Sequence, residues 1–100
     1  MSSPTLPLVL AREAEDDFAG VLQYTRETWG GPQVDVYRAI VDKALLTIAR
    51  HPRIGRRRFA LGKGFRVFPA GQHVVIYEVH VDAIYVHRIL HSRMDVSGYI

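Results

Sequence analysis

The chain has 100 residues, of which 48% are hydrophobic and 23% charged, with no cysteine and a formal net charge of +3. These values fit one folded domain spanning residues 1–100, and the lack of cysteine excludes disulfides, thiolate metal sites and a cysteine nucleophile. No apolar run approaches the roughly 20 residues of a membrane span, and no basic segment precedes an apolar one near the N-terminus, so we expect a cytoplasmic protein without a membrane partner.

The first half of the chain has the pattern of one strand followed by two helices. Leu6–Leu10 is a short apolar run preceded by prolines, which predicts a strand at the edge of a sheet. From Ala11 onward, apolar residues recur every three or four positions, which predicts a helix ending at Gly30-Gly31-Pro32. A second stripe with the same period ends at His51-Pro52, so the two helices should form a helical hairpin. We expect its aromatic residues to pack in the core or at the corner: Tyr24, Trp29 and Tyr37.

In the second half the hydrophobic period becomes two. This period predicts three strands, Phe65–Pro69, His73–His80 and Ala83–His91, joined by turns short enough for antiparallel hairpins. Strict alternation would divide the last strand into two faces, one with Ile84, Val86, Arg88 and Leu90 and the other with Tyr85, His87, Ile89 and His91. After Ser92 we expect about one turn of helix.

The predicted fold class is therefore α+β. An N-terminal strand and a helical hairpin precede a three-stranded antiparallel meander, and the hairpin should cover one face of the sheet. The opposite face is also partly apolar, so we expect it to form a groove or a partner-binding surface.

Basic residues gather in the connector between the second helix and the meander. Seven basic residues and no acidic one lie between Arg50 and Arg66, whereas the rest of the chain is slightly acidic. Such a segment attracts phosphate backbones or an acidic protein partner, and a solvated basic loop is the third possibility. The run Arg56-Arg57-Arg58 followed by Phe59 resembles nucleic-acid-binding composition, although a single aromatic residue is weak support for base stacking.

The stretch from His87 to Asp95 has two histidines, two arginines and an aspartate within nine residues. On a regular strand His87 and His91 would share a face about 13 Å apart, which is too far for one metal ion. We therefore expect no metal and no cofactor. Instead, the histidines would form hydrogen bonds with the backbone or with a carboxylate.

A second interpretation of the same residues is general acid–base chemistry. An imidazole at His91, together with guanidinium groups at Arg66, Arg88 and Arg93, would suit metal-independent RNA cleavage, because one group moves a proton and the others hold the phosphate. Glu78 is a possible base. The structural alternative is that Arg88 extends across the sheet and pairs with an acid, while Asp95 either caps the terminal turn or pairs with an arginine.

A set of residues in fixed order along nearly the whole chain matches a known pattern. In the first half these are Ala14, Asp17-Phe18, Tyr24-Thr25, Trp29-Gly30, Gln33 and Tyr37. In the second half they are Pro52, Gly55, Gly64-Phe65-Arg66, His73, Ile76-Tyr77, Arg88-Ile89-Leu90-His91 and Met94-Asp95. In this order and spacing the chain resembles the RelE/ParE superfamily of toxins from bacterial toxin-antitoxin modules, and within it the ParE-type branch.

This resemblance implies a toxin that is held inactive by a cognate antitoxin, ParD-like or similar, in a toxin-antitoxin hetero-oligomer. ParE-type members are similar in inhibiting DNA gyrase by stabilising its cleaved-DNA intermediate, whereas RelE-type members cleave messenger RNA on the ribosome. The fold alone does not choose between these activities. Val74, beside His73, stands where ribonuclease members resemble one another in carrying a basic residue, and the Met94-Asp95 ending looks like the ParE branch. We therefore predict a gyrase inhibitor that is not an enzyme, with the ribosome-dependent endonuclease as the alternative.

A binding inhibitor needs a complementary surface and not a reactive group. On the resemblance, the candidate contacts to the target are Arg66, Arg88, His91, Arg93 and Met94. If the chain were a ribonuclease, the catalytic residues would be Arg66, Arg88 and His91. Antitoxin tails of this type combine acidic and apolar residues, so the candidate contacts to the antitoxin are Arg56, Arg57, Arg58, Val74 and Ile76.

Overall fold

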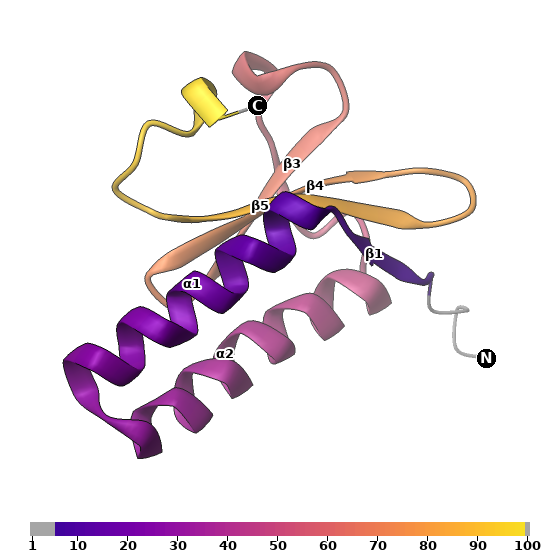
Figure 1. Cartoon of the computed structure of the whole chain (residues 1–100). Coiled ribbons are helices and arrows are strands. Elements are labelled where there is room, and N and C mark those ends of the chain that lie inside the picture. The colour runs from indigo at the N-terminus through magenta and orange to yellow at the C-terminus, as the bar shows by residue number, and fades with distance from the viewer. Residues whose placement is uncertain (1–5, 100) are drawn as a thin grey trace.

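In the computed structural model, which describes residues 6–99, a five-stranded sheet packs against two helices (Figure 1). The elements in chain order are β1 (Leu8–Leu10), α1 (Arg12–Trp29), α2 (Gly31–Arg50), β2 (Arg56–Arg57), η1 (Phe59–Leu61), β3 (Phe65–Ala70), β4 (His73–Val79), β5 (Ile84–His91) and η2 (Val96–Tyr99), the two η elements being short 3-10 helices. The predicted α+β order of strand, helical hairpin and antiparallel meander is confirmed.

The helical hairpin forms because its junction favours a sharp reversal. Gly30 has a φ of 90°, in the left-handed region that favours glycine, and Pro32 occupies the first turn of α2, where a missing N–H costs nothing. Glu13 and Glu15 in the first turn of α1 face the positive end of the helix dipole. Among the described residues, neither helix is long and apolar enough to cross a membrane.

The sheet has the strand order β1-β5-β4-β3-β2. β1 pairs in parallel with β5, and all other neighbours are antiparallel, so the prediction of an N-terminal edge strand is confirmed. The other edge is formed by β2, which the sequence did not predict. Its two residues, Arg56 and Arg57, carry no hydrophobic period, and they form a strand only because they pair with Val67 and Arg66.

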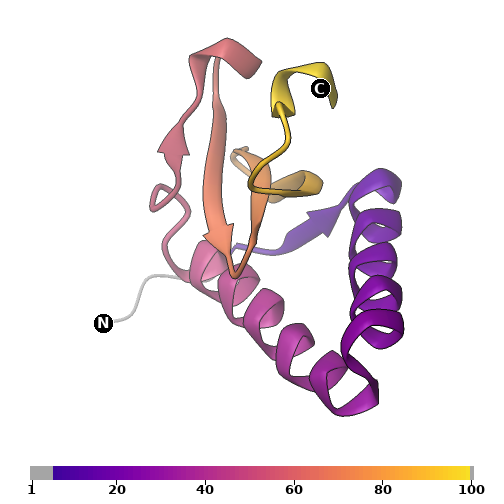
Figure 2. The ribbon, with the colours of Figure 1, turned by 90° about the vertical axis from the view of Figure 1, so that its left-hand side faces the viewer.

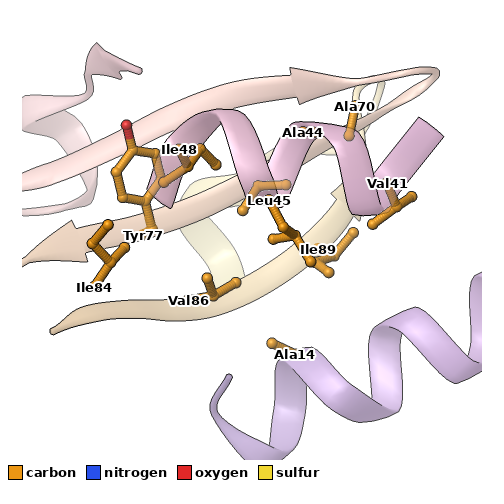
Figure 3. Close-up of a cluster of buried hydrophobic side chains, with 11 residues drawn as sticks. Ala14, Val41, Ala44, Leu45, Ile48, Ala70, Tyr77, Ile84, Val86 and Ile89 are labelled. Carbon is orange, nitrogen blue, oxygen red and sulfur yellow. The ribbon is translucent and has the colours of Figure 1, made fainter. Parts of the chain in front are cut away.

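The main core lies between the helical hairpin and one face of the sheet (Figure 3). Leu45 and Ile48 from α2 pack with Tyr77 of β4 and with Val86 and Ile89 of β5, and all five side chains are buried. Figures 1 and 2 show the two helices on the same side of the sheet, joined at their Gly30 end. The apolar stripes predicted for both helices are therefore the surfaces that bury this core.

The second face of the sheet is covered more than the sequence suggested. Ile76 and Leu90 pack with Val96 of η2, and Leu61 of η1 lies against this cluster. The two short helical segments lie beside each other over the sheet (Figures 1 and 2). Ile76 is completely buried. The chain's own connector and tail therefore occupy the centre of this face, so a groove or partner-binding surface on it has to lie beside them.

A bulge in β5 changes which residues face the core. Ile76 pairs with Arg88 but Tyr77 pairs with Val86, so His87 is an extra residue on β5. Val86 and Ile89 consequently both reach the helix-side core, while Arg88 and Leu90 face the other side. The predicted strict alternation is wrong beyond Val86. His87 and His91, predicted to share a face, lie on opposite faces.

Candidate functional site

Arg88 is tied to the first helix by an ion pair. Its Nε donates to Oδ2 of Asp17 at 2.7 Å and its Nη2 donates to Oδ1 at 2.9 Å, while the backbone N–H of Ile89 donates to the same carboxylate at 3.0 Å. Hydrogen bonding to Asp17 raises the pKa of Arg88 further above its ordinary value. Nη1 donates to the carbonyl of Tyr99 at 3.4 Å. The structural alternative, that Arg88 pairs with an acid, is confirmed.

Arg66 has a structural partner as well. Its Nη1 donates to the carbonyl oxygens of Gly55 at 2.8 Å and Arg53 at 3.1 Å, and so fastens the connector to β3. Arg66 pairs in register with Tyr77, whereas His91 pairs with His73, four residues away on β4. At the usual rise per residue this separates the two positions by about 13 Å along the strand. The three ribonuclease candidates, Arg66, Arg88 and His91, are therefore not brought together.

His91 belongs to a polar cluster at the end of the sheet where a turn joins β3 to β4. Its ring lies 5.2 Å from that of His73, whose Nδ1 is hydrogen-bonded to the hydroxyl of Tyr37, and that hydroxyl accepts the N–H of Gln72 at 2.9 Å. Burial, and secondarily the neighbouring His91, lower the pKa of His73 below its ordinary value. Both histidines and Tyr37 line a pocket of about 480 Å³.

The same pocket carries two exposed aromatic side chains. Trp29 is 71% exposed and Tyr24 is 65% exposed, so the prediction that they pack in the core or corner is wrong. Tyr37, in contrast, packs against the core as predicted. Tyr24 lies off the stripe of α1 that contains the buried Ala14 and Thr25, whereas Trp29 follows Thr25 by four residues on the same face but is the last residue of the helix.

His73 makes stability depend on pH in a defined direction. The folded protein holds this imidazole neutral to a lower pH than the unfolded chain, whose pKa is about 6.5. The unfolded state therefore binds more protons between the two pKa values, and stability rises with pH across that window. We expect the free energy of unfolding from urea titrations to fall as the pH drops below about 6.5. His73→Gln should flatten this slope, and the exposed His51→Gln should not; equal slopes in all three proteins would contradict the assignment.

Glu78 is held by a histidine on the second face. His87 Nε2 lies 2.7 Å from Oε1 of Glu78, and His80 Nε2 lies 3.9 Å from the other carboxylate oxygen. The expectation that histidines pair with carboxylates is thus confirmed for His87. Glu78, the possible general base, is engaged by this pair and lies on the face opposite His91.

The triple-arginine run is divided between two surfaces. Arg56 pairs with Val67 and Arg57 with Arg66, and successive residues of a strand point to opposite faces. Arg56 and Arg58 line a groove of about 320 Å³, which we call the apolar groove and whose other lining residues are Ile54, Val67, Phe68, Pro69 and Val74. Arg57 lines a separate groove of about 340 Å³, which we call the cationic groove and whose other lining residues are Arg53, Phe59, Lys63, Gly64, Arg66 and Val79.

The antitoxin candidates therefore fall into three places. Arg56, Arg58 and Val74 share the apolar groove, and Arg57 faces the cationic groove. Ile76, with none of its surface exposed, lies under Val96 and cannot contact a partner while the tail keeps this position. The prediction for Ile76 is corrected accordingly.

The tail presents the remaining target candidates. Arg93 and Met94 are exposed between β5 and η2. Asp95 accepts the hydroxyl hydrogen of Ser97 at 2.7 Å and its backbone N–H at 3.2 Å, and these bonds lower the pKa of Asp95. The prediction that Asp95 caps the terminal turn is confirmed.

Two residues that organise these surfaces were not assigned roles from the sequence. Asp17 anchors Arg88, and the Tyr77 hydroxyl donates to the carbonyl of Pro52 and accepts the N–H of Gly55, both at 2.8 Å. A signal existed for Tyr77, because a tyrosine at a core position of an apolar strand needs a partner for its hydroxyl. The position of Asp17 beside the apolar stripe of α1 was a weaker indication that this carboxylate has a structural partner.

Comparison with known proteins agrees with this architecture. Residues 8–96 match the family described as the ParE toxin of the type II toxin-antitoxin system, parDE. A protein named Toxin ParE1 from Caulobacter vibrioides is 31% identical over 94 residues, covering 94% of this chain and 97% of its own length. Another protein named Toxin ParE1, from Mycobacterium tuberculosis, is 34% identical over 90 residues, covering 89% and 92%.

A solved structure shares the fold at low sequence identity. It is described as the chromosomal ParDE TA system from P. aeruginosa, and it superposes with a TM-score of 0.75 at 15% identity, covering 89% of this chain and 98% of that one. The family match and the two relatives each extend over most of the strand, hairpin and meander described above. This chain therefore belongs to the family of ParE toxins of type II toxin-antitoxin systems.

Proposed function

We propose that this ParE toxin is neutralised by a cognate antitoxin and inhibits DNA gyrase by stabilising its cleaved-DNA complex. The observation that carries the choice of target is the separation of the ribonuclease candidates. Arg88 is paired with Asp17, Arg66 holds two connector carbonyls, and His91 lies at the other end of the sheet. An inhibitor that acts through its surface needs no assembled set of proton-transfer and phosphate-binding groups, whereas a nuclease does.

The apolar groove is the proposed seat of the antitoxin. Arg56 and Arg58 flank apolar side chains there, among them Val74. An antitoxin segment that combines acidic and apolar residues fits this surface, because carboxylates meet the arginines and apolar side chains replace water over the groove. The resulting complex would be the expected toxin-antitoxin hetero-oligomer.

The exposed Arg93 and Met94 are the proposed contacts to gyrase. Neither side chain has a structural role comparable with those of Arg66 and Arg88, and an arginine beside a methionine is a composition enriched at protein interfaces. Reversing the charge with Arg93→Glu should raise the concentration of toxin needed for half-maximal gyrase inhibition about tenfold. Arg12→Glu, on an exposed part of α1, is the matched control and should leave that concentration unchanged.

The experiment that tests the function uses the antitoxin-free protein in two assays. One measures supercoiling and accumulation of cleaved DNA by gyrase, and the other measures cleavage of messenger RNA in a translating extract. Inhibited supercoiling with intact message supports the proposal. Cut message with normal supercoiling overturns it in favour of the ribosome-dependent endonuclease.

A further inference from the structure

We propose that the cationic groove binds the phosphate backbone of DNA. The inference rests on the proposed function in one respect, because it takes the DNA to be the duplex held by gyrase. It adds a second contact to the protein-binding surface of Arg93 and Met94. The toxin would then hold both components of the complex that it stabilises.

Among residues 6–99, the charges in the cationic groove have no acidic partner. Arg53, Arg57, Lys63 and Arg66 line it together, and no carboxylate is among its lining residues. Within residues 6–99 the three ion pairs that form involve Glu78 and Asp17, and none includes a basic residue of the connector. Arg57 lies directly opposite Arg66 in register, an arrangement that is destabilising for like charges. A bound polyanion would relieve this repulsion.

Arg66 is held in a position from which it can donate to a ligand. The hydrogen bonds to Arg53 and Gly55 both use Nη1. Within the described part of the chain Nε and Nη2 of Arg66 form no hydrogen bond, and no buried side-chain nitrogen lacks a partner, so neither of these two donors is completely buried. Nε and Nη2 are the pair that forms a fork to two oxygens of one phosphate. Because the guanidinium is already anchored, little further ordering is needed on binding.

The groove fits nucleic acid better than it fits an acidic peptide. Its lining contains four cations, and its largest apolar group is Phe59, a side chain that is 71% exposed and can lie against a sugar or a base. The acidic and apolar segment expected of an antitoxin finds its apolar contacts in the other groove, where Arg56 and Arg58 flank five uncharged residues. Because successive side chains here point to opposite faces, Arg57 faces the groove proposed for DNA, and Arg56 and Arg58 face the groove proposed for the antitoxin.

The test measures binding of a short fluorescent DNA duplex to the full chain by anisotropy over a series of salt concentrations. The double variant Arg57→Gln/Lys63→Gln removes two groove cations and leaves the anchoring Arg66 in place. Since each phosphate contact contributes about 0.9 to the slope of log affinity against log salt, the slope should shrink by about two. Arg12→Gln/Arg38→Gln changes the net charge equally at exposed helix positions and should keep the slope of the unsubstituted chain.

The outcomes separate this inference from the proposed function. The inference is supported if the groove variant loses DNA affinity and stabilises gyrase–DNA cleavage complexes more weakly than the control variant. It is overturned if both variants bind DNA alike, or if polyglutamate of equal charge displaces the duplex as well as unlabelled DNA does. If the unsubstituted chain binds DNA through the groove but does not inhibit gyrase, the proposed target fails and the DNA site stands. Equal thermal unfolding midpoints for the two variants establish that folding is not the cause.

Discussion

Replacing Asp17 by alanine is expected to lower the free energy of unfolding by about 3 kcal/mol, because it leaves the Arg88 guanidinium without its counter-charge in a largely buried place. The substitution also removes the acceptor of the Ile89 N–H, 3.0 Å from Oδ2 of Asp17. Alanine is a good helix former, so the loss would come from the pair and not from α1 itself. Urea unfolding of the purified chain measures the change.

The adjacent carboxylate supplies the control for this prediction. Asp16 is exposed on the same helix, and Asp16→Ala should change stability by no more than about 0.5 kcal/mol. In a double-mutant cycle, adding Arg88→Met to Asp17→Ala should cost less than Arg88→Met does alone, since the unpaired charge has gone. If Asp16→Ala and Asp17→Ala lowered the free energy of unfolding by similar amounts, the ion pair with Arg88 would not be the cause of the loss.

Gly55→Ala is the second substitution with a large expected effect, about 3 kcal/mol of destabilisation from overpacking together with broken hydrogen bonds. A Cβ at this position would lie 2.4 Å from the hydroxyl oxygen of Tyr77 and 2.8 Å from its Cε1. Tyr77 is completely buried and its hydroxyl is bonded on both sides, so it cannot move away without losing the contacts to Gly55 and Pro52.

Two further variants make the second prediction specific. Gly20→Ala, at a helical position where a Cβ meets nothing within 4 Å, should stabilise the chain by about 0.5–1 kcal/mol. Tyr77→Phe removes the closest clashing atom, so Gly55→Ala should cost clearly less in that background than in the unsubstituted chain. Thermal unfolding followed by circular dichroism gives the stabilities of Gly55→Ala, Gly20→Ala, Tyr77→Phe and the Gly55→Ala/Tyr77→Phe double variant. An undiminished cost in the Tyr77→Phe background would refute a clash at the hydroxyl.

The periodic parts of the fold were predictable because burial imposes a regular spacing. The stripe through Val41, Ala44 and Ile48 recurs at helical intervals, and Val75 and Tyr77 alternate as a strand requires. What escaped prediction has no period. Arg56 and Arg57 form an edge strand through pairing alone, and a bulge leaves no mark in composition.

Surface residues were harder to assign because a side chain's availability depends on residues distant in sequence. Arg88 is occupied by Asp17, which precedes it by 71 positions. Arg57 lies within the basic connector and Arg66 lies at its end. Of these two arginines, only Arg66 is anchored by hydrogen bonds to connector carbonyls. Charge counting located the basic segment correctly. The division of its arginines between two grooves required the register of β2 against β3.

The extra residue at His87 means that β5 could lose one residue without exchanging its two faces. Deleting His87 would remove the bulge and leave plain alternation from Ile84 onward, with Val86 and Ile89 still in the helix-side core and Arg88 and Leu90 still on the opposite face. The deletion would remove the histidine paired with Glu78 but keep Arg88 on the face from which it reaches Asp17. A regular strand without a bulge would instead exchange its inside and outside when one residue is lost.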